Sequence, residues 1–242
     1  MNIVIDVGNT LIKFGVFNSQ KLIFKDKGTL TNYLSKIEEI VVLFPNISNA
    51  VLSIVGNFPT EYIAVTKRYF KIFYISKDIL FPIKIAYKTP DTLGIDRMVL
   101  AASAYFQYSS KNILVIDTGT CITYDFVDDK GIYQGGAISP GIQLRYQSLN
   151  EYTHKLPLLE MEFPDYFIGK STKSSIHSGV INGVIYEIDG VINQYDKKFK
   201  DLTVILTGGS ADFLRDKLKN SIFANSNFLL EGLNFLFEYN KV

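Results

Sequence analysis

A strand–turn–strand pattern with an aspartate at the turn occurs twice in this chain of 242 residues. The first copy is Asp6–Thr10 (DVGNT) and the second is Asp117–Thr120 (DTGT). Each copy follows a short apolar run, and a second alternating run comes after it, at 11–17 and at 121–127. Because alternation with a period of two is typical of half-buried strands, each copy predicts a hairpin. The repetition predicts two related halves that face each other across a shared ligand.

The elements predicted around each hairpin support this division. In the first half we expect strands at 2–7, 11–17, 20–25, 51–55 and 71–75, and helices at 29–44, 60–70 and 92–106, the last capped by Asp91 or Thr92. In the second half we expect strands at 113–117, 121–127, 131–134 and 202–206, and helices at 142–151, 172–197, 211–218 and 228–239. Loops are expected at 79–90 and 152–168. The chain therefore predicts an α/β fold with one domain at 1–110 and another at 111–242. The sequence leaves open whether the final apolar helix crosses back onto the first half.

Composition excludes several classes of protein. The formal net charge is +1, which argues against a large electrostatic surface for nucleic acid or an anionic membrane. A single cysteine allows no intramolecular disulfide. No apolar stretch reaches the roughly 18 residues of a membrane span, and Asp6 interrupts the early apolar run. These features predict a soluble, cytoplasmic protein that binds neither nucleic acid nor membrane.

The two aspartate turns have the residues of a phosphate site. A glycine lets the backbone approach an anion closely, and turn N–H groups can bind phosphate oxygens. Asn9 and Thr10 can donate hydrogen bonds, and Lys13 on the returning strand can add a positive charge. Alone, the first turn is equally well explained as an ordinary hairpin. The aspartate at both strand ends favours the functional interpretation, because turn formation does not require it.

A third candidate is the segment Gly94–Arg97 (GIDR), preceded by Tyr87. An aspartate in the first turn of a helix is usually a capping residue, and an adjacent arginine is usually a surface charge. Here a strongly apolar helix follows at once. A fixed carboxylate beside a fixed guanidinium suits a substrate that carries a hydroxyl and a carboxylate. Asp96 could accept the hydroxyl proton, and Arg97 could bind the carboxylate.

The remaining candidates are weaker. Gly169–Thr172 (GKST) resembles the end of a P-loop, but the required earlier glycine is replaced by Pro164, so a helix capped by Ser171 or Thr172 is the simpler interpretation. Thr207–Ala211 (TGGSA) predicts a strand–turn–helix junction that a base or ribose can approach. Asp125 is expected to be a solvated carboxylate and Cys121 a core residue. His154 and His177 lack metal-ligand spacing.

In their order along the chain, these motifs resemble type III pantothenate kinases. The resemblance covers nearly the whole chain and includes, besides the motifs above, Gly135–Gly141 and Leu230–Leu233. It implies an actin-like, ribonuclease H-like ATPase fold, with mixed sheets flanked by helices and the nucleotide in the cleft between two tandem domains. It also implies phosphorylation of pantothenate by ATP, the first step toward coenzyme A, by a homodimeric enzyme.

The resemblance implies roles for particular residues. Asp96 is the expected catalytic base, and Asp117 the expected ligand of a monovalent cation, K⁺ or NH₄⁺. Mg²⁺ arrives with ATP, and Asp6 is expected to hold it, directly or through water. The expected ATP contacts are Asp6, Val7, Gly8, Asn9, Thr10, Leu11, Ile12, Lys13 and Thr120. The expected pantothenate contacts are Tyr87, Gly94, Ile95, Asp96, Arg97 and Thr172.

Three positions depart from the family pattern, and two other functions compete with it. Cys121 replaces a usual alanine, Met98 a frequent aromatic residue, and Arg145 lies in a segment that is more often apolar. None of these changes removes a proposed catalytic group. The competing functions are a different small-molecule kinase of the same fold group, and a nucleotide-binding regulatory protein without kinase activity. Pantothenate-dependent ADP release distinguishes all three.

Overall fold

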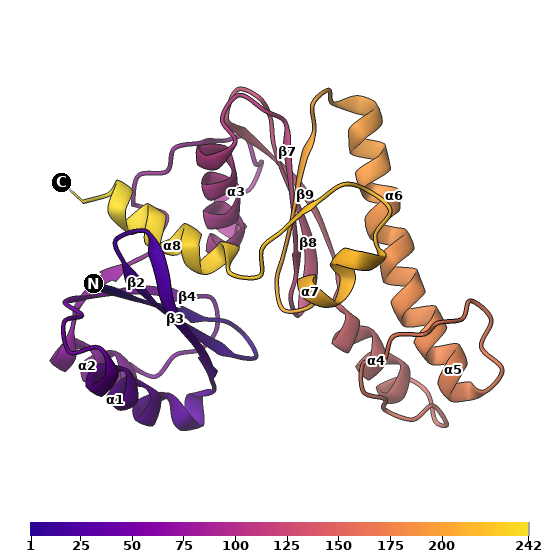
Figure 1. The fold of residues 1–242 in the computed structure, drawn as a ribbon, viewed down its shortest axis with the longest axis horizontal. Helices are drawn as coiled ribbons and strands as arrows, with labels where there is room; N and C mark the ends of the chain where they lie inside the picture. Colours follow the sequence, from indigo (N-terminus) through magenta and orange to yellow (C-terminus); the bar gives the residue numbers. More distant parts are fainter. Residues whose placement is uncertain (242) are drawn as a thin grey trace. The chain divides into compact units, whose positions relative to one another are not determined.

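The computed structural model describes residues 1–241 and divides into two compact units (Figure 1). The first comprises residues 1–107 together with the C-terminal segment from Asn227, and the second comprises Tyr108–Ser226. The predicted boundary near residue 110 is therefore close to the observed one. The assignment of all of 111–242 to the second half is wrong, because the last helix, α8 (Phe228–Tyr239), packs on α3 (Ile95–Gln107) of the first unit. Among the described residues, no helix is long and apolar enough to cross a membrane.

The first unit is built on a mixed five-stranded sheet. Its strands are β1 (Asn2–Val7), β2 (Ile12–Asn18), β3 (Lys21–Gly28), β4 (Asn49–Ile54) and β5 (Lys71–Tyr74), arranged in the order β3-β2-β1-β4-β5. The hairpin strands β1, β2 and β3 pair antiparallel, whereas β4 and β5 run parallel to β1. Each of these strands was predicted, with ends shifted by up to three residues.

Side chains of β1 point alternately to the two faces of the sheet, and the two faces pack against different helices. Ile3, Ile5 and Val7 join a core cluster with the helices α1 (Tyr33–Leu43) and α2 (Thr60–Tyr69). The other face carries Asn2, whose side-chain amide donates to Asn234 and Glu238 of α8 at 3.3 and 2.8 Å. Because side chains two residues apart share a face of a strand, Asp6 lies on the same side as Asn2, the side covered by α8.

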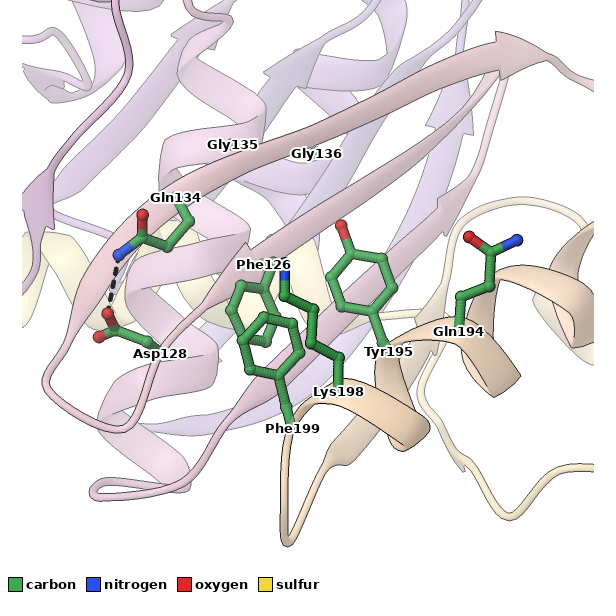
Figure 2. Close-up of a pocket in the computed structure, with 9 residues that line it drawn as sticks. All are labelled: Phe126, Asp128, Gln134, Gly135, Gly136, Gln194, Tyr195, Lys198 and Phe199. Atoms are coloured by element: carbon green, nitrogen blue, oxygen red, sulfur yellow. Dashed lines mark hydrogen bonds between the residues drawn. The ribbon is translucent and has the colours of Figure 1, made fainter.

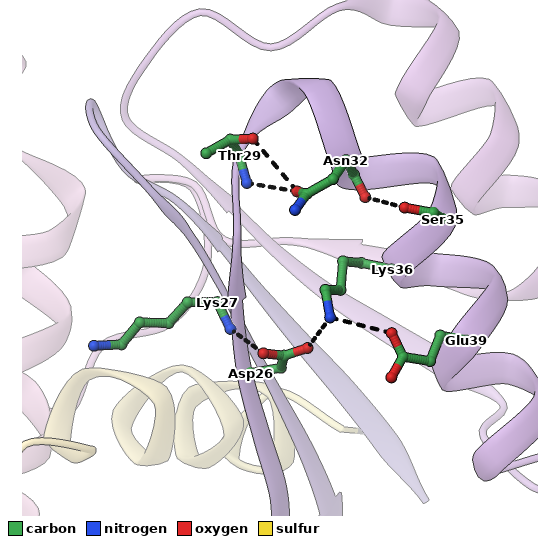
Figure 3. Close-up of polar contacts among 7 residues, drawn as sticks. All are labelled: Asp26, Lys27, Thr29, Asn32, Ser35, Lys36 and Glu39. Carbon is green, nitrogen blue, oxygen red and sulfur yellow. Dashed lines mark hydrogen bonds and ion pairs between the residues drawn. The ribbon is translucent and has the colours of Figure 1, made fainter.

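The helix α1 begins later and buries other residues than predicted. A short 3₁₀ turn (Leu30–Asn32) precedes it, and the Asn32 side chain accepts a hydrogen bond from the Thr29 backbone N–H at 2.7 Å (Figure 3). Its buried residues are Tyr33, Ile37 and Ile40. The spacing of apolar residues in 29–44 instead predicts a stripe of Leu30, Leu34, Ile37, Val41 and Phe44, which is wrong at its start, because Leu30 and Leu34 are exposed. Lys36 contacts Asp26 on β3 at 2.7 Å and Glu39 at 3.1 Å, which ties the helix to the sheet edge.

The second unit repeats the sheet of the first. Its strands are β7 (Ile113–Thr118), β8 (Cys121–Val127), β9 (Ile132–Pro140), β10 (Thr203–Thr207) and β11 (Phe223–Ala224), in the order β11-β10-β7-β8-β9. Here too the hairpin strands are antiparallel, and β10 and β11 run parallel to β7. The same strand order in both units confirms the two related halves. Strand β9 extends six residues beyond its predicted end at 134, and β11 was not predicted.

Helices of the second unit pack on one face of its sheet. A core cluster joins alternate residues of β7, β8 and β10 to α4 (Ile142–Glu151), α6 (Gly183–Lys198) and α7 (Ala211–Leu214). The single helix predicted at 172–197 is divided into α5 (Thr172–His177), a π-helical turn (Ser178–Asn182) and α6. The spacing of apolar residues in 172–197 predicts a buried stripe of Ile176, Val180, Val184, Ile188, Val191 and Tyr195. The first four are buried, whereas Val191 and Tyr195 are only half-buried. Residues 152–171 contain no regular helix or strand, as predicted.

Candidate active site

The first aspartate turn forms the floor of a cavity of about 320 Å³. Strand β1 ends at Val7, and the Gly8 backbone N–H donates to the Leu11 carbonyl at 3.1 Å, closing the turn. Asn9 and Thr10 are exposed, so their side chains can reach a ligand. The cavity is lined by residues 7–12 together with Thr29–Thr31, Gly56 and Asn57. Six of the predicted ATP contacts therefore line one concave surface, of a size that suits a small polar ligand.

Asp6 is a buried carboxylate whose charge is only partly compensated. It is 3% exposed, and Lys13, its cross-strand partner, places Nζ 3.6 Å from Oδ2. Burial raises the pKa of Asp6; the Lys13 ammonium opposes that change, and the nearby Asp96 carboxylate adds to it. A cation that neutralises two neighbouring carboxylates would lower this electrostatic cost. The residues present therefore fit a site for Mg²⁺ beside the turn.

Asp96 lies at the start of α3, near enough to Asp6 for its charge to add to the raised pKa of that carboxyl. The Asp96 Oδ1 accepts the Arg97 backbone N–H at 2.9 Å. A Cβ on Gly94 would lie 2.5 Å from the same oxygen, so a glycine is needed there to leave this carboxylate its position. The helix begins at Ile95, so the expected cap at Asp91 or Thr92 is wrong: Pro90–Thr92 form a separate 3₁₀ turn.

Arg97 is a buried cation rather than a surface charge. It is 6% exposed, and its guanidinium carbon lies 6.0 Å from the centre of the Tyr87 ring. A guanidinium near an aromatic face is favourable and holds both groups in a fixed orientation. Lys77 secures the preceding segment by donating to the Pro90 carbonyl at 2.7 Å. The first unit therefore brings together the whole predicted segment from Tyr87 to Arg97 and places its acid beside Asp6.

The second aspartate turn is enclosed by glycines. Asp117 ends β7 half-buried, and a Cβ on Gly208 would lie 2.3 Å from its Oδ1. Gly208 has φ +97°, a conformation that L-residues with side chains rarely adopt. On the other side, the Gly141 backbone N–H donates to the Thr120 carbonyl at 3.0 Å. The glycines let the backbone approach this carboxylate closely, and a carboxylate supplies the oxygen ligands that such a cation needs. Asp117 therefore fits the predicted monovalent ion by the chemistry of its donor atoms.

Two sequence interpretations on β8 are wrong. Asp125 is fully buried rather than solvated, and it accepts hydrogen bonds from Tyr133 at 2.7 Å and Thr123 at 2.9 Å. Cys121, expected in the core, is exposed at the first position of the strand. The strand itself was predicted correctly. Whether a given side chain of the strand is buried depends on which face of the sheet the helices cover, and that was not predicted.

Thr172, the remaining predicted substrate contact, begins α5. Ser171 caps that helix, and its side chain accepts the Ser174 backbone N–H at 3.2 Å, as the simpler interpretation of this motif predicts. Thr172 is exposed and lines a cavity of about 660 Å³ with Arg145, Leu149 and Ile176. Because Thr172 belongs to the second unit and Tyr87–Arg97 to the first, its part in one substrate site stays a prediction.

Arg145 belongs to a half-buried network of polar side chains that was not predicted from the sequence. Its guanidinium pairs with Glu187 of α6, and Glu187 also accepts a hydrogen bond from Tyr124 at 2.8 Å. Burial alone would raise the pKa of Glu187, but hydrogen bonds from Arg145, Tyr124 and Ser139 outweigh it and lower that pKa. The fully buried Ser53, the β4 partner of Asp6, was also missed; among described residues its hydroxyl has no hydrogen-bond partner.

A further cavity lies apart from every predicted site residue (Figure 2). It measures about 580 Å³, and its wall includes Phe126, Tyr195 and Phe199. Lys198 lies over the Phe199 ring at 5.3 Å, and Asp128 accepts a hydrogen bond from Gln134 at 2.8 Å. The Lys198 ammonium thus contacts an aromatic ring, and Asp128 is hydrogen-bonded to Gln134. The cavity contains no predicted site residue, so we do not include it in the candidate active site.

Within residues 1–241, no group of three or more His, Cys, Asp or Glu side chains is arranged to hold a metal ion. His177 is buried, with Nδ1 2.8 Å from the Tyr146 hydroxyl, which fits a structural role. Any cation here would therefore take most of its ligands from elsewhere, as a nucleotide-borne Mg²⁺ does through phosphate oxygens and water.

The two related α/β units define the class of fold: that of the actin-like and sugar-kinase group. One solved structure, the inorganic polyphosphate/ATP-glucomannokinase of Arthrobacter sp. strain KM, is similar with a TM-score of 0.50 and 14% identity, over 99% of this chain and 98% of that one. Another, described as a Baf family transcriptional activator from Campylobacter jejuni, is similar with a TM-score of 0.65 and 19% identity, over 98% of each chain. At these identities the likeness shows the fold alone.

The family is shown by sequence. The family model for type III pantothenate kinase matches residues 2–194. The type III pantothenate kinase of Flavobacterium psychrophilum is 49% identical over 241 residues, which cover 100% of both chains. The chain belongs to the type III pantothenate kinase family.

Proposed function

We propose that this protein transfers the γ-phosphoryl group of ATP to the primary hydroxyl of pantothenate, giving 4′-phosphopantothenate for coenzyme A synthesis. The observation that carries the proposal is that the first turn and the candidate base belong to one unit: Asp96 lies at the start of α3, and its charge adds to the effect of burial in raising the pKa of Asp6. A base beside a phosphate turn is the arrangement that phosphoryl transfer to an alcohol requires. Family membership identifies the alcohol.

In the proposed reaction, two cations and several residues of the two turns neutralise the negative charge of the ATP phosphates. When bound, Mg²⁺ neutralises phosphate charge and a monovalent cation adds a further positive charge. Asp6 is the proposed holder of Mg²⁺ and Asp117 that of the monovalent cation. Asn9, Thr10 and the backbone of residues 6–13 bind phosphate oxygens, as does Thr120. Lys13, now 3.6 Å from Asp6, is close enough to redirect its ammonium toward a phosphate.

Asp96 and Arg97 divide the work on pantothenate. Asp96 accepts the hydroxyl proton as the oxygen attacks the γ-phosphorus and ADP leaves with the electrons of the broken bond. Arg97, oriented by Tyr87, binds the carboxylate or a carbonyl, while Gly94 and Ile95 contact the substrate through their backbone. Thr172 is a further proposed contact. We propose that the enzyme is a homodimer and acts in the cytoplasm, as its family resemblance implies.

The test is ADP production by the purified protein with ATP, Mg²⁺ and pantothenate, first in potassium and then in sodium. We expect turnover that depends on pantothenate and is stimulated by potassium. Turnover with a sugar or acetate in place of pantothenate would assign another kinase activity. A folded protein that binds ATP without turnover in either salt would favour a regulatory role.

A further inference from the structure

The guanidinium of Arg145 joins the end of β9 to α6. Arg145 lies in the second turn of α4, where its Nε donates to the Pro140 carbonyl at 2.8 Å. Its Nη2 donates to the Ser139 hydroxyl at 3.0 Å and to Glu187 Oε2 at 2.5 Å. A single side chain therefore holds the last two residues of a strand against a helix of the same unit.

The chain at that point presses directly on the second aspartate turn. The Gly141 N–H donates to the Thr120 carbonyl, and a Cβ on Gly141 would lie 2.4 Å from the carbonyl oxygens of both Gly119 and Thr120. Pro140 is also the cross-strand partner of Cys121, the residue after the turn. Because the backbone of Gly141 is in close contact with Gly119 and Thr120, we expect a shift of Pro140 or Gly141 to change the position of these two turn residues.

The guanidinium is itself held firmly. Its carboxylate partner Glu187 accepts a hydrogen bond from the hydroxyl of Tyr124, a residue in the middle of β8 that is 1% exposed. The Arg145 and Glu187 side chains are only 22% and 28% exposed. A planar guanidinium with partners in several fixed directions restricts position more than a lysine ammonium does.

We propose that Arg145 is a positioning residue for ATP: it holds Pro140–Gly141 in place and so fixes the turn Asp117–Thr120. The inference rests on the proposed function, in which this turn contacts the ATP phosphates and the monovalent cation. Arg145 acts through Gly141 and has no contact with the reacting atoms. Removing it should therefore weaken ATP use while leaving Asp96 able to accept a proton.

One alternative role makes a different kinetic prediction. Arg145 lines the cavity that also contains Thr172, a proposed pantothenate contact. A guanidinium in direct contact with the pantothenate carboxylate would control the KM for pantothenate rather than the KM for ATP. The KM values for ATP and for pantothenate therefore distinguish a residue that positions the turn from one that binds pantothenate directly.

The experiment compares Arg145→Met with Arg215→Met, which removes an arginine of the same unit whose side chain is 51% exposed. Steady-state kinetics would give both KM values and kcat, and calorimetry with ATP and Mg²⁺ would give the dissociation constant. For Arg145→Met we expect the KM and Kd for ATP to rise about tenfold and the KM for pantothenate to change less than about threefold. Glu187→Gln should shift the same two constants in the same direction by a smaller factor, and Arg215→Met should match wild type.

Several results would overturn the proposal. One is an unchanged Kd for ATP in Arg145→Met; another is a rise confined to the KM for pantothenate. A uniform loss of activity together with a lowered Tm would reduce Arg145 to a purely structural residue, and Glu187→Gln, which keeps the side-chain shape, checks this separately. If wild type binds ATP but does not phosphorylate pantothenate, the proposed function fails while ATP calorimetry still tests Arg145. Wild type that binds no ATP would overturn both.

Discussion

The two aspartate turns have the same strand topology but balance their charge differently. In the first, four residues connect the strands and the cross-strand partner of Asp6 is Lys13. In the second, two residues connect the strands and the partner of Asp117 is Thr123. The lysine of the first turn is thus replaced by a hydroxyl in the second.

The surroundings of the turns differ in the same sense. Asp6 is 3% exposed and has a second carboxylate, Asp96, nearby. Asp117 is half-buried and lies against Gly208 and Gly119, where a Cβ would be 2.3 and 3.6 Å from its Oδ1. The comparison teaches that one repeated motif can serve two purposes. The first turn has its own cation, Lys13, and a second carboxylate nearby, whereas the second turn, in the function proposed above, takes its cation from solution.

The largest expected effect tests what is specific to the first turn. Asp96→Asn should lower kcat by at least about 10²-fold while ATP binding stays nearly unchanged, because the amide keeps the shape of the carboxylate but cannot accept the proton. Steady-state turnover and ATP calorimetry measure the two quantities. Asp91→Asn, at an exposed aspartate of the same segment, is the matched control and should behave as wild type. Near-normal turnover of Asp96→Asn would remove Asp96 from the role of base.

The next effect tests what is specific to the second turn. Asp117→Ala should abolish the stimulation by potassium and leave activity about tenfold or more below that of wild type in potassium, since the cation loses its carboxylate. The measurement is a potassium titration of pantothenate-dependent ADP release at constant ionic strength. Asp212→Ala, at an exposed carboxylate of the same unit, should keep the wild-type titration. If Asp117→Ala still responded to potassium, Asp117 would not be the ligand of the monovalent cation, and the proposed difference in function between the two turns would be wrong.

The sequence predicted features that depend on neighbouring residues and missed features that depend on contacts between distant parts of the chain. Strands, hairpins and the doubled turn depend on local alternation and turn chemistry, and these were predicted. The Arg145–Glu187 pair and the burial of Asp125 depend on which helix covers which face, and residues 145 and 187 lie far apart in the chain. The return of α8 to the first unit is of the same kind. Its apolar pattern predicted a buried helix but contained no information about which sheet would bury it.

A smaller effect tests the glycine cradle of Asp117. Gly208→Ala should lower the free energy of unfolding by about 1–3 kcal/mol, because its Cβ would lie 2.3 Å from Asp117 and its φ of +97° is strained for alanine. Gly209→Ala is the matched control, since nothing lies within 4 Å of the position of its Cβ. Chemical denaturation of both variants measures the difference. Equal stability of the two would mean that the space beside Asp117 is not tightly enclosed.

The smallest expected effect returns to the carboxylate of the first turn. Burial and the neighbouring Asp96 raise the pKa of Asp6 in the folded state, so the ionised form is disfavoured there relative to the unfolded chain. The folded protein then binds this proton more tightly, and the destabilisation, present in full at pH values above the raised pKa, is relieved as the pH falls through it.

Asp6→Asn removes that penalty and should raise Tm at pH 7 by roughly 2 °C, while it impairs catalysis with Mg²⁺ and ATP. The gain should shrink as the pH is lowered through the raised pKa of Asp6, because the wild-type carboxyl then becomes protonated as well. Thermal unfolding from pH 7 to pH 4 measures this, with Asp129→Asn, at an exposed aspartate, as the control. A lower Tm for Asp6→Asn at pH 7 would show that the Lys13 pair contributes more than burial costs, and the first turn would then be stabilised by its charges rather than strained by them.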